Sequence, residues 1–183
     1  ALKGINRSDI AITEVTYDLD NLILDRYDAV QGYAFSEPFA LAARGIKVRL
    51  IPVRDQQLHP YAQLFFATED CITEHSNIFR TFLTASFAGW QQAMTHRQAA
   101  VETVVKVSGG LADLATERKI IETMVPYIAG NLGLERFGTI EMRRWENNLA
   151  SYIRFGIIPR PTTFEELVND EFLREIYPEP PLS

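Results

Sequence analysis

The expected fold class rests on residues 28–53, which read DAVQGYAFSEPFALAARGIKVRLIPV. Residues 28–34 read as a short strand, and residues 46–53 read as a further strand. Between them, residues 36–44 carry helix signals at both ends: Ser36 as N-cap, Pro38 in the first turn and Gly45 after the last residue. A strand, a helix and a strand joined by short links predict a parallel sheet with right-handed crossovers.

The pattern extends in both directions from this segment. Upstream, residues 10–15 alternate like a half-buried strand and residues 18–25 carry a short apolar helical face. Downstream, one more short strand is expected at residues 63–67. The apolar spacing then becomes helical, with helices expected at residues 79–94, 98–107, 114–128 and 142–153. We therefore expect three parts: a βαβαβ lobe at residues 1–57, a strand and helices of another lobe at 58–175, and a flexible tail at 176–183.

Composition and charge exclude several classes of protein. The chain has 183 residues, of which 46% are hydrophobic and 23% charged, as in ordinary folded domains. Its formal net charge is −6, so no basic surface is expected for nucleic acid or anionic membranes. No stretch is apolar enough for a transmembrane helix. The single cysteine, Cys71, excludes an internal disulfide.

Catalytic and metal-binding patterns are missing from the sequence. The three histidines, His59, His75 and His96, have no metal-ligand spacing, and no Gly-x-Ser-x-Gly elbow is present. Cys71 lies among acidic residues, an environment that disfavours a nucleophilic cysteine. We therefore predict no catalytic residues, no metal and no cofactor.

Two segments remain as candidates for ligand binding. Residues 32–38 lie where an expected parallel strand meets a helix N-terminus, the edge at which such sheets bind ligands. Tyr61 follows the polar crossing at residues 54–60. Tyr33 and Tyr61 suit stacking against a flat ligand, and Glu37 suits hydrogen bonds from its amino groups. The alternative is that both tyrosines are hinge packing and Glu37 only complements the helix dipole.

Several stretches together resemble the solute-binding proteins of ABC importers. They are YDAVQGY at residues 27–33, SEPFA at 36–40, ARG at 43–45, FLTASFAGW at 82–90 and FGII at 155–158. The resemblance is to the branch that includes binders of thiamine pyrimidine precursors, with relatives for riboflavin, sulfonates, nitrate and bicarbonate. It implies a type II periplasmic-binding-protein fold, in which two α/β lobes close on a ligand. Family members carry further sequence ahead of the point where this chain starts, so we expect a fold incomplete at the N-terminus.

The resemblance also implies a function and a site. The ligand-binding residues are expected to be Tyr33, Ser36, Glu37 and Tyr61. The function is expected to be non-catalytic capture of a small solute in the periplasm, or otherwise outside the cytoplasm, and its delivery to an ABC permease and ATPase. Self-association covering the surface of the missing lobe segment is also expected.

The choice of ligand rests on the N-terminus of the helix at residues 36–44. Glu37 adds negative charge there and Pro38 removes a donor, which favours a thiamine-precursor-like pyrimidine or related heterocycle over a sulfonate or nitrate. Three other functions stay open: a ligand-sensing receptor ectodomain, sulfonate or nitrate binding, and a structural half that binds nothing. The related thiamine pyrimidine synthases carry a cysteine-rich motif, and the single Cys71 argues against that enzymatic activity.

Overall fold

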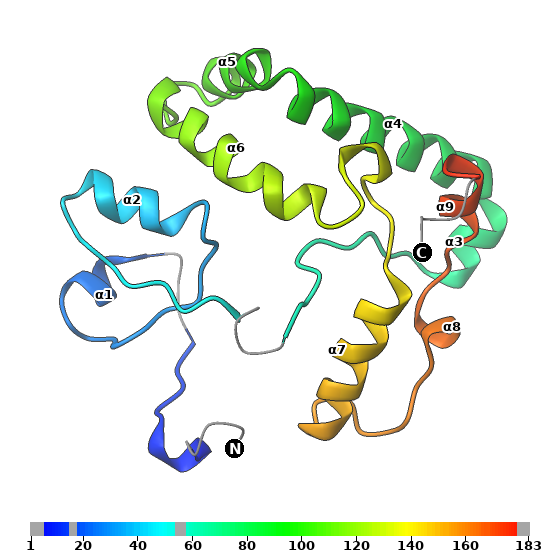
Figure 1. The fold of residues 1–183 in the computed structure, drawn as a ribbon, viewed down its shortest axis with the longest axis horizontal. Helices are drawn as coiled ribbons and strands as arrows, with labels where there is room; N and C mark the ends of the chain where they lie inside the picture. The colour runs from blue at the N-terminus through cyan, green and yellow to red at the C-terminus, as the bar shows by residue number, and fades with distance from the viewer. Residues whose placement is uncertain (1–5, 15–17, 54–57, 179–183) are drawn as a thin grey trace. The chain divides into compact units, whose positions relative to one another are not determined.

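The structure is a computed structural model that describes residues 6–14, 18–53 and 58–178. The chain divides into two compact units, Ala1–Arg49 and Leu50–Ser183. The first unit contains a 3-10 helix η1 (Arg7–Asp9) and the helices α1 (Asp20–Ile23) and α2 (Glu37–Ala43), as Figure 1 shows. Val15, most of the crossing at 54–60 and the end of the expected tail lie outside the described residues.

Helix α2 confirms the helix expected at residues 36–44. It begins after Ser36, although the Ser36 side chain makes no capping hydrogen bond, and Pro38 lies in its first turn. It ends at Ala43 with Arg44 as the C-cap, and Gly45 follows at φ +77°, a conformation that favours glycine. Leu41 is only 2% exposed, so α2 supplies the one buried side chain among the described residues of this unit.

The expected α/β fold is wrong for the described residues, because none of them forms a strand. The stretches predicted as strands at 10–14, 28–34, 46–53 and 63–67 make no ladder with a neighbour. Many of their apolar side chains also stay exposed: Ile12 and Ile51 are each 66% exposed. A strand needs a paired neighbour and a covered face, and an alternating sequence provides neither by itself. The parallel-sheet lobe is therefore replaced by short helices and irregular backbone.

The second unit is helical. Figure 1 labels its α-helices in chain order. Its elements are α3 (Glu69–Glu74), α4 (Ser76–Thr95), α5 (Arg97–Val107), α6 (Leu114–Ala129), the 3-10 helix η3 (Leu134–Arg136), α7 (Met142–Arg154), α8 (Phe164–Leu167) and α9 (Glu171–Ile176). The four long helices, α4 to α7, fall where the apolar spacing predicted them, whereas the short helices α3, α8 and α9 and the 3-10 helix η3 were not predicted.

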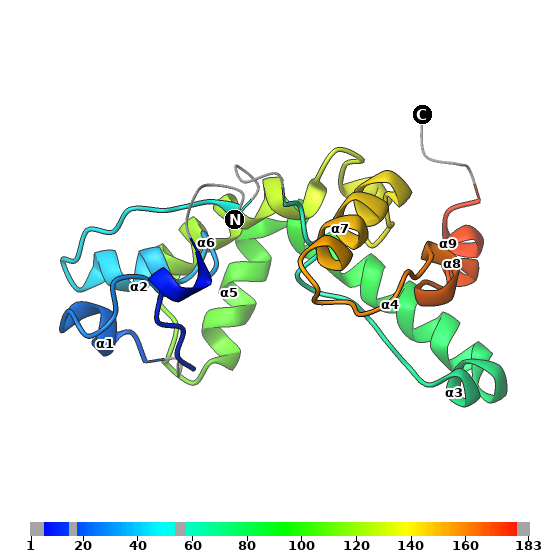
Figure 2. The same ribbon diagram turned by 90° about the horizontal axis from the view of Figure 1, so that it is seen from below.

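One core of this unit lies where α4, α5 and α6 meet. Figure 2 shows α5 and α6 lying side by side, consistent with the contacts between them. Gly109 and Gly110, at φ +64° and +93°, form the turn that joins these two helices. The buried side chains are Met94, Val101, Ile121 and Val125, each at most 7% exposed.

A second core joins the first half of α4 to α9. Leu83 and Phe87 of α4 pack with Phe172 of α9. The guanidinium of Arg80 forms an ion pair with the Glu175 carboxylate, which ties the same two helices together at the surface. The expected apolar face of α4 is thus confirmed at Leu83, Phe87 and Met94. Phe82 and Trp90, from the same sequence pattern, lie at its margin and stay 49% and 40% exposed.

Candidate functional site

Three of the four predicted site residues lie together at the start of α2. The backbone N–H of Tyr33 donates to Glu37 Oε2 at 2.6 Å. The N–H of Ser36 donates to the carbonyl oxygen of Tyr33 at 3.0 Å, which closes a turn. The Glu37 side chain therefore folds back over the loop that precedes its own helix. The predicted grouping of Tyr33, Ser36 and Glu37 arises from local hydrogen bonds.

Gly32 makes this back-folded geometry possible. A Cβ atom at residue 32 would lie 2.8 Å from Glu37 Oε2, closer than Cβ contacts allow. The next residue, Tyr33, is 43% exposed, and its ring stacks on Phe35 with centroids 5.2 Å apart and an interplanar angle of 22°. This loop presents an accessible aromatic surface next to a half-buried carboxylate. Such a pair suits a flat ligand with an amino group.

Tyr61 lies in the second unit and is fixed by α7. Its hydroxyl oxygen accepts a hydrogen bond from the backbone N–H of Glu141 at 2.9 Å. The Arg144 guanidinium lies over the Tyr61 ring, with its carbon 4.0 Å from the ring centroid. Trp145 contacts the ring at a centroid separation of 6.1 Å. Burial raises the pKa of the Tyr61 hydroxyl above its usual value, so the phenol is neutral at physiological pH.

The backbone before Tyr61 is held by two side chains that the sequence did not point to. Asn148, 8% exposed, donates from Nδ2 to the His59 carbonyl oxygen at 2.7 Å. Its Oδ1 accepts from the His59 N–H at 3.1 Å. Arg144 donates to the carbonyl oxygens of His59 and Pro60 at 2.7 and 3.0 Å. Its place in the sequence pattern could have pointed to Asn148, because this polar residue lies next to the apolar face of an amphipathic helix, at Trp145 and Leu149.

The structure thus places Tyr33, Ser36 and Glu37 in one unit and Tyr61 in the other. A site shared by all four residues remains a prediction.

Within the described ranges, no group of three or more His, Cys, Asp or Glu side chains is arranged to hold a metal ion. The Cys71 side chain is half-buried, and the backbone N–H of Cys71 donates to Thr68 Oγ1 at 3.2 Å, at the start of α3. In the part of the chain that is described, no helix combines the length and the apolar character of a membrane span.

Comparison with known proteins defines the class. Residues 1–100, more than half of the chain, match the family described as NMT1/THI5 like. The earlier resemblance to ABC solute-binding proteins is therefore confirmed at the level of the class, while the branch is not resolved. The chain belongs to the NMT1/THI5-like family.

A curated relative agrees with this assignment. Over 174 residues the chain is 20% identical to the riboflavin-binding protein RibY of Chloroflexus aurantiacus. The match covers 93% of this chain and 49% of that protein, so the chain spans about half the length of its relative. No solved structure matches the chain.

Proposed function

We propose that this chain captures a small heterocyclic solute outside the cytoplasm, without chemical change, and delivers it to an ABC importer made of a permease and an ATPase. The ligand we favour is a thiamine-precursor-like pyrimidine or a related heterocycle. The observation that carries the proposal is the match of residues 1–100 to the NMT1/THI5-like family. The relative RibY supports heterocycle binding in particular, because its name assigns it riboflavin.

The binding residues we propose are Tyr33, Ser36, Glu37 and Tyr61. The exposed Tyr33 ring offers a stacking surface, and the Glu37 carboxylate lies close enough to orient an amino group on the stacked ligand. Glu37 Oε2 already accepts from the Tyr33 N–H, so the proposal assigns Oε1 to the ligand. Pro38 has no backbone N–H, so the first turn of α2 offers an anion one donor fewer, which supports an amine-bearing ligand over an anion.

The direct test is thermal unfolding with a ligand panel. The panel contains 4-amino-5-hydroxymethyl-2-methylpyrimidine, thiamine, riboflavin, taurine and nitrate. A ligand at about 100 times its Kd stabilises the folded state by roughly 2.7 kcal/mol, which raises Tm by several degrees in a chain of this size. We expect this shift with the aminopyrimidine. A shift with taurine or nitrate alone would contradict the heterocycle assignment, and no shift with any ligand would contradict solute capture by this chain.

A substitution at Glu37 tests the assignment of the carboxylate. Glu37→Gln keeps an oxygen for the Tyr33 N–H but removes the charge. Because hydrogen bonds to charged groups contribute about 1.5–3 kcal/mol, we expect the aminopyrimidine affinity to fall at least tenfold. Glu14→Gln, an exposed position in the same unit, is the matched control. Unchanged affinity in Glu37→Gln, measured by calorimetry, would exclude Glu37 from the site.

Riboflavin is the competing ligand, favoured by the name of the relative. Its isoalloxazine ring offers a larger stacking area and carbonyl acceptors in place of a single amino donor. If riboflavin is the ligand, its fluorescence is quenched on binding because its ring stacks on tyrosine. Glu37→Gln then has little effect while Tyr33→Ala abolishes binding. The two ligands are thus distinguished by which of these two substitutions is the more damaging.

A further inference from the structure

The Arg144 side chain contacts the segment that carries Tyr61 in two ways. Nε donates to the His59 carbonyl oxygen at 2.7 Å and Nη2 donates to the Pro60 carbonyl oxygen at 3.0 Å, so one edge of the guanidinium holds two successive peptide groups. The guanidinium carbon also lies 4.0 Å from the centroid of the Tyr61 ring. The planar cation therefore occupies one face of that ring.

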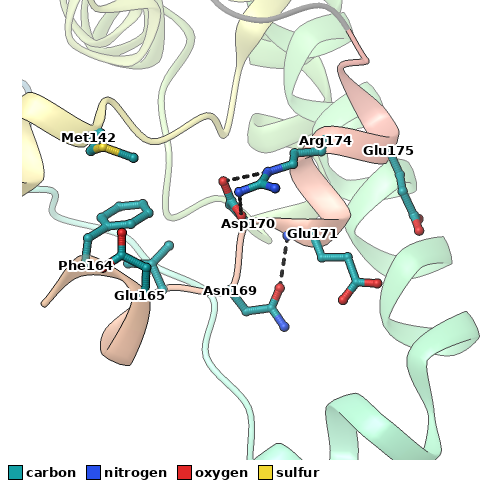
Figure 3. A pocket seen from close by; sticks show the side chains of 9 residues that line it. Met142, Phe164, Glu165, Asn169, Asp170, Glu171, Arg174 and Glu175 are labelled. Atoms are coloured by element: carbon teal, nitrogen blue, oxygen red, sulfur yellow. Dashed lines mark hydrogen bonds and ion pairs between the residues drawn. The ribbon is translucent and has the colours of Figure 1, made fainter.

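Further contacts fix the half-buried Tyr61 ring against this cation. The Tyr61 hydroxyl oxygen accepts from the Glu141 N–H at 2.9 Å, and Trp145 contacts the ring at a centroid separation of 6.1 Å. Trp145 is in turn met edge to face by Phe164, which lines the hollow beside α8 and α9 that Figure 3 shows. These contacts restrict rotation of the Tyr61 ring, so the same face stays covered by Arg144.

The positive charge of Arg144 is opposed only at a distance. Its Nη1 lies 3.9 Å from Glu141 Oε1, which is long for an ion pair. Glu141 also accepts a hydrogen bond from Asn131 through Oε2, at 3.3 Å. The side chains of Arg144 and Glu141 are 29% and 27% exposed, so solvent screens their charges only in part. A net positive field therefore remains at the Tyr61 ring.

A cation on one face of an aromatic ring affects what can stack on the other face. An aromatic ring attracts cations through the negative charge of its π face. Arg144 already makes this contact with Tyr61, so the ring offers less attraction to a second cation. The two positive charges would also repel each other across the thickness of one ring. A neutral heterocycle meets no such repulsion and keeps its stacking contact.

We propose that Arg144 is a positioning residue that sets the specificity of the solute site: through the Tyr61 ring, it favours neutral flat rings over cationic ones. This inference rests on the proposed function, in which Tyr61 stacks on the ligand, and it narrows the ligand class to uncharged heterocycles. It places the pyrimidine precursor above thiamine, whose thiazolium ring carries a permanent positive charge.

Calorimetric titration of the full chain with two probes tests the proposal. The probes are 4-amino-5-hydroxymethyl-2-methylpyrimidine and its N-methylated pyrimidinium form, which share a ring but differ in charge. The measured quantity is the affinity for the neutral probe divided by the affinity for the cationic one. Attraction of the cation to Glu37 is the same in wild type and in Arg144 variants, so it cancels when their ratios are compared. Arg144→Gln removes the positive charge and should lower the ratio by about threefold or more.

Three further variants separate the charge of Arg144 from its structural role. Arg144→Lys keeps the charge but lacks the planar fork, so we expect both probes to bind more weakly, with a ratio within about twofold of wild type. Glu141→Gln keeps the backbone N–H that binds Tyr61 and removes the opposing carboxylate, so the ratio should rise. Arg143→Gln, at the adjacent exposed position of α7, should leave both affinities unchanged.

The possible results distinguish this inference from the proposed function. No binding of either probe to wild type would overturn the proposed function and, with it, this inference. Binding of the neutral probe with the same ratio in wild type and Arg144→Gln would overturn the role of Arg144 alone, since a purely structural residue weakens both probes equally. If circular dichroism shows that Arg144→Gln does not fold, Glu141→Gln decides, and a ratio that stays constant or falls in that variant would overturn the inference.

Discussion

Asn148 shows how a single side chain positions the segment that carries Tyr61. Its side-chain amide forms hydrogen bonds with both the N–H and the carbonyl oxygen of His59, as the backbone of a paired strand would. His59 and Asn148 are 89 residues apart in sequence. Nothing in the local pattern of either residue predicts this contact, because it depends on how the chain folds over that distance.

Replacing Asn148 by alanine should destabilise the second unit. The change removes two hydrogen bonds. The His59 N–H loses its acceptor, while the His59 carbonyl oxygen keeps the bond from Arg144, and the loss costs about 1–3 kcal/mol. Urea unfolding measures the loss. Asn147→Ala, at the adjacent exposed position of α7, has the same effect on helix propensity and should change stability by less than about 0.5 kcal/mol. Equal effects of the two substitutions would refute the anchoring role of Asn148.

At the scale of elements, α6 depends on its first residues. Asp113 accepts hydrogen bonds from the N–H groups of Ala115 and Thr116, both at 3.0 Å. These bonds, with the Thr116 side-chain interaction as the largest cause, hold the pKa of the Asp113 carboxyl below its ordinary value of 3.8. The folded state therefore prefers the ionised form of this side chain.

The pH dependence of the Asp113 cap follows from that direction. Because the pKa is lower in the folded state, the cap stabilises fully above about pH 4. This stability is lost as the pH falls through the depressed pKa. Asp113→Ala should be less stable than wild type at neutral pH, and this difference should shrink under acid. Thermal unfolding from pH 7 down to pH 2 checks this, and a difference that stays constant with pH would contradict it.

The junction of α4, α5 and α6 depends on Met94, which is 2% exposed. Met94→Ala should leave a cavity and lower the free energy of unfolding by about 2–5 kcal/mol. Gln92→Ala, on the exposed side of the same helix, should change it by less than about 0.5 kcal/mol. Denaturant unfolding of both variants measures the contrast. A Met94→Ala loss as small as that of the control would mean that this core is not formed.

Elements and site residues differed in how far the sequence could predict them. The helices followed from spacing at positions such as Leu83, Phe87 and Met94, because helical hydrogen bonds and the faces they create are local. Tyr33, Ser36 and Glu37 lie together because they are close in sequence, but the strand end that was expected to hold Tyr33 is absent, and their role in binding stays a prediction. The strands could not be predicted in this way, since pairing depends on distant partners, and Ile12 and Ile51 have none among the described residues. The contacts of Arg144 with Pro60 and Tyr61 could not be predicted either, because these residues are far apart in sequence.

At the scale of the whole molecule, the second unit leaves many apolar side chains exposed. Phe66 and Leu111 are 93% and 94% exposed, and Ile78 is 68% exposed. Ile78 and Phe82 also line a shallow hollow with Asn77 and Thr81. Exposed apolar surface of this extent favours association, which the net charge of −6 opposes.

We therefore expect reversible self-association that strengthens with protein concentration and with salt. Sedimentation velocity at several concentrations measures it. Ile78→Asp should shift the distribution towards monomer, whereas Asn77→Asp, which adds the same charge at the adjacent position, should shift it less. A single monomeric species at every concentration and salt level would exclude this association.

The contact between Trp145 and Tyr61 also gives the molecule a spectroscopic reporter. The chain has only two tryptophans, and Trp90→Phe would leave Trp145 as the sole indole. Nε1 of Trp145 is buried and has no hydrogen-bond partner among the described residues. This burial shields the excited indole from water and shifts its emission to shorter wavelength. Tyr61, 6.1 Å away, transfers excitation energy to it efficiently. A solute that stacks on Tyr61 and quenches its excited state would lower that transfer, so binding of such a solute could be followed by intrinsic fluorescence without a label.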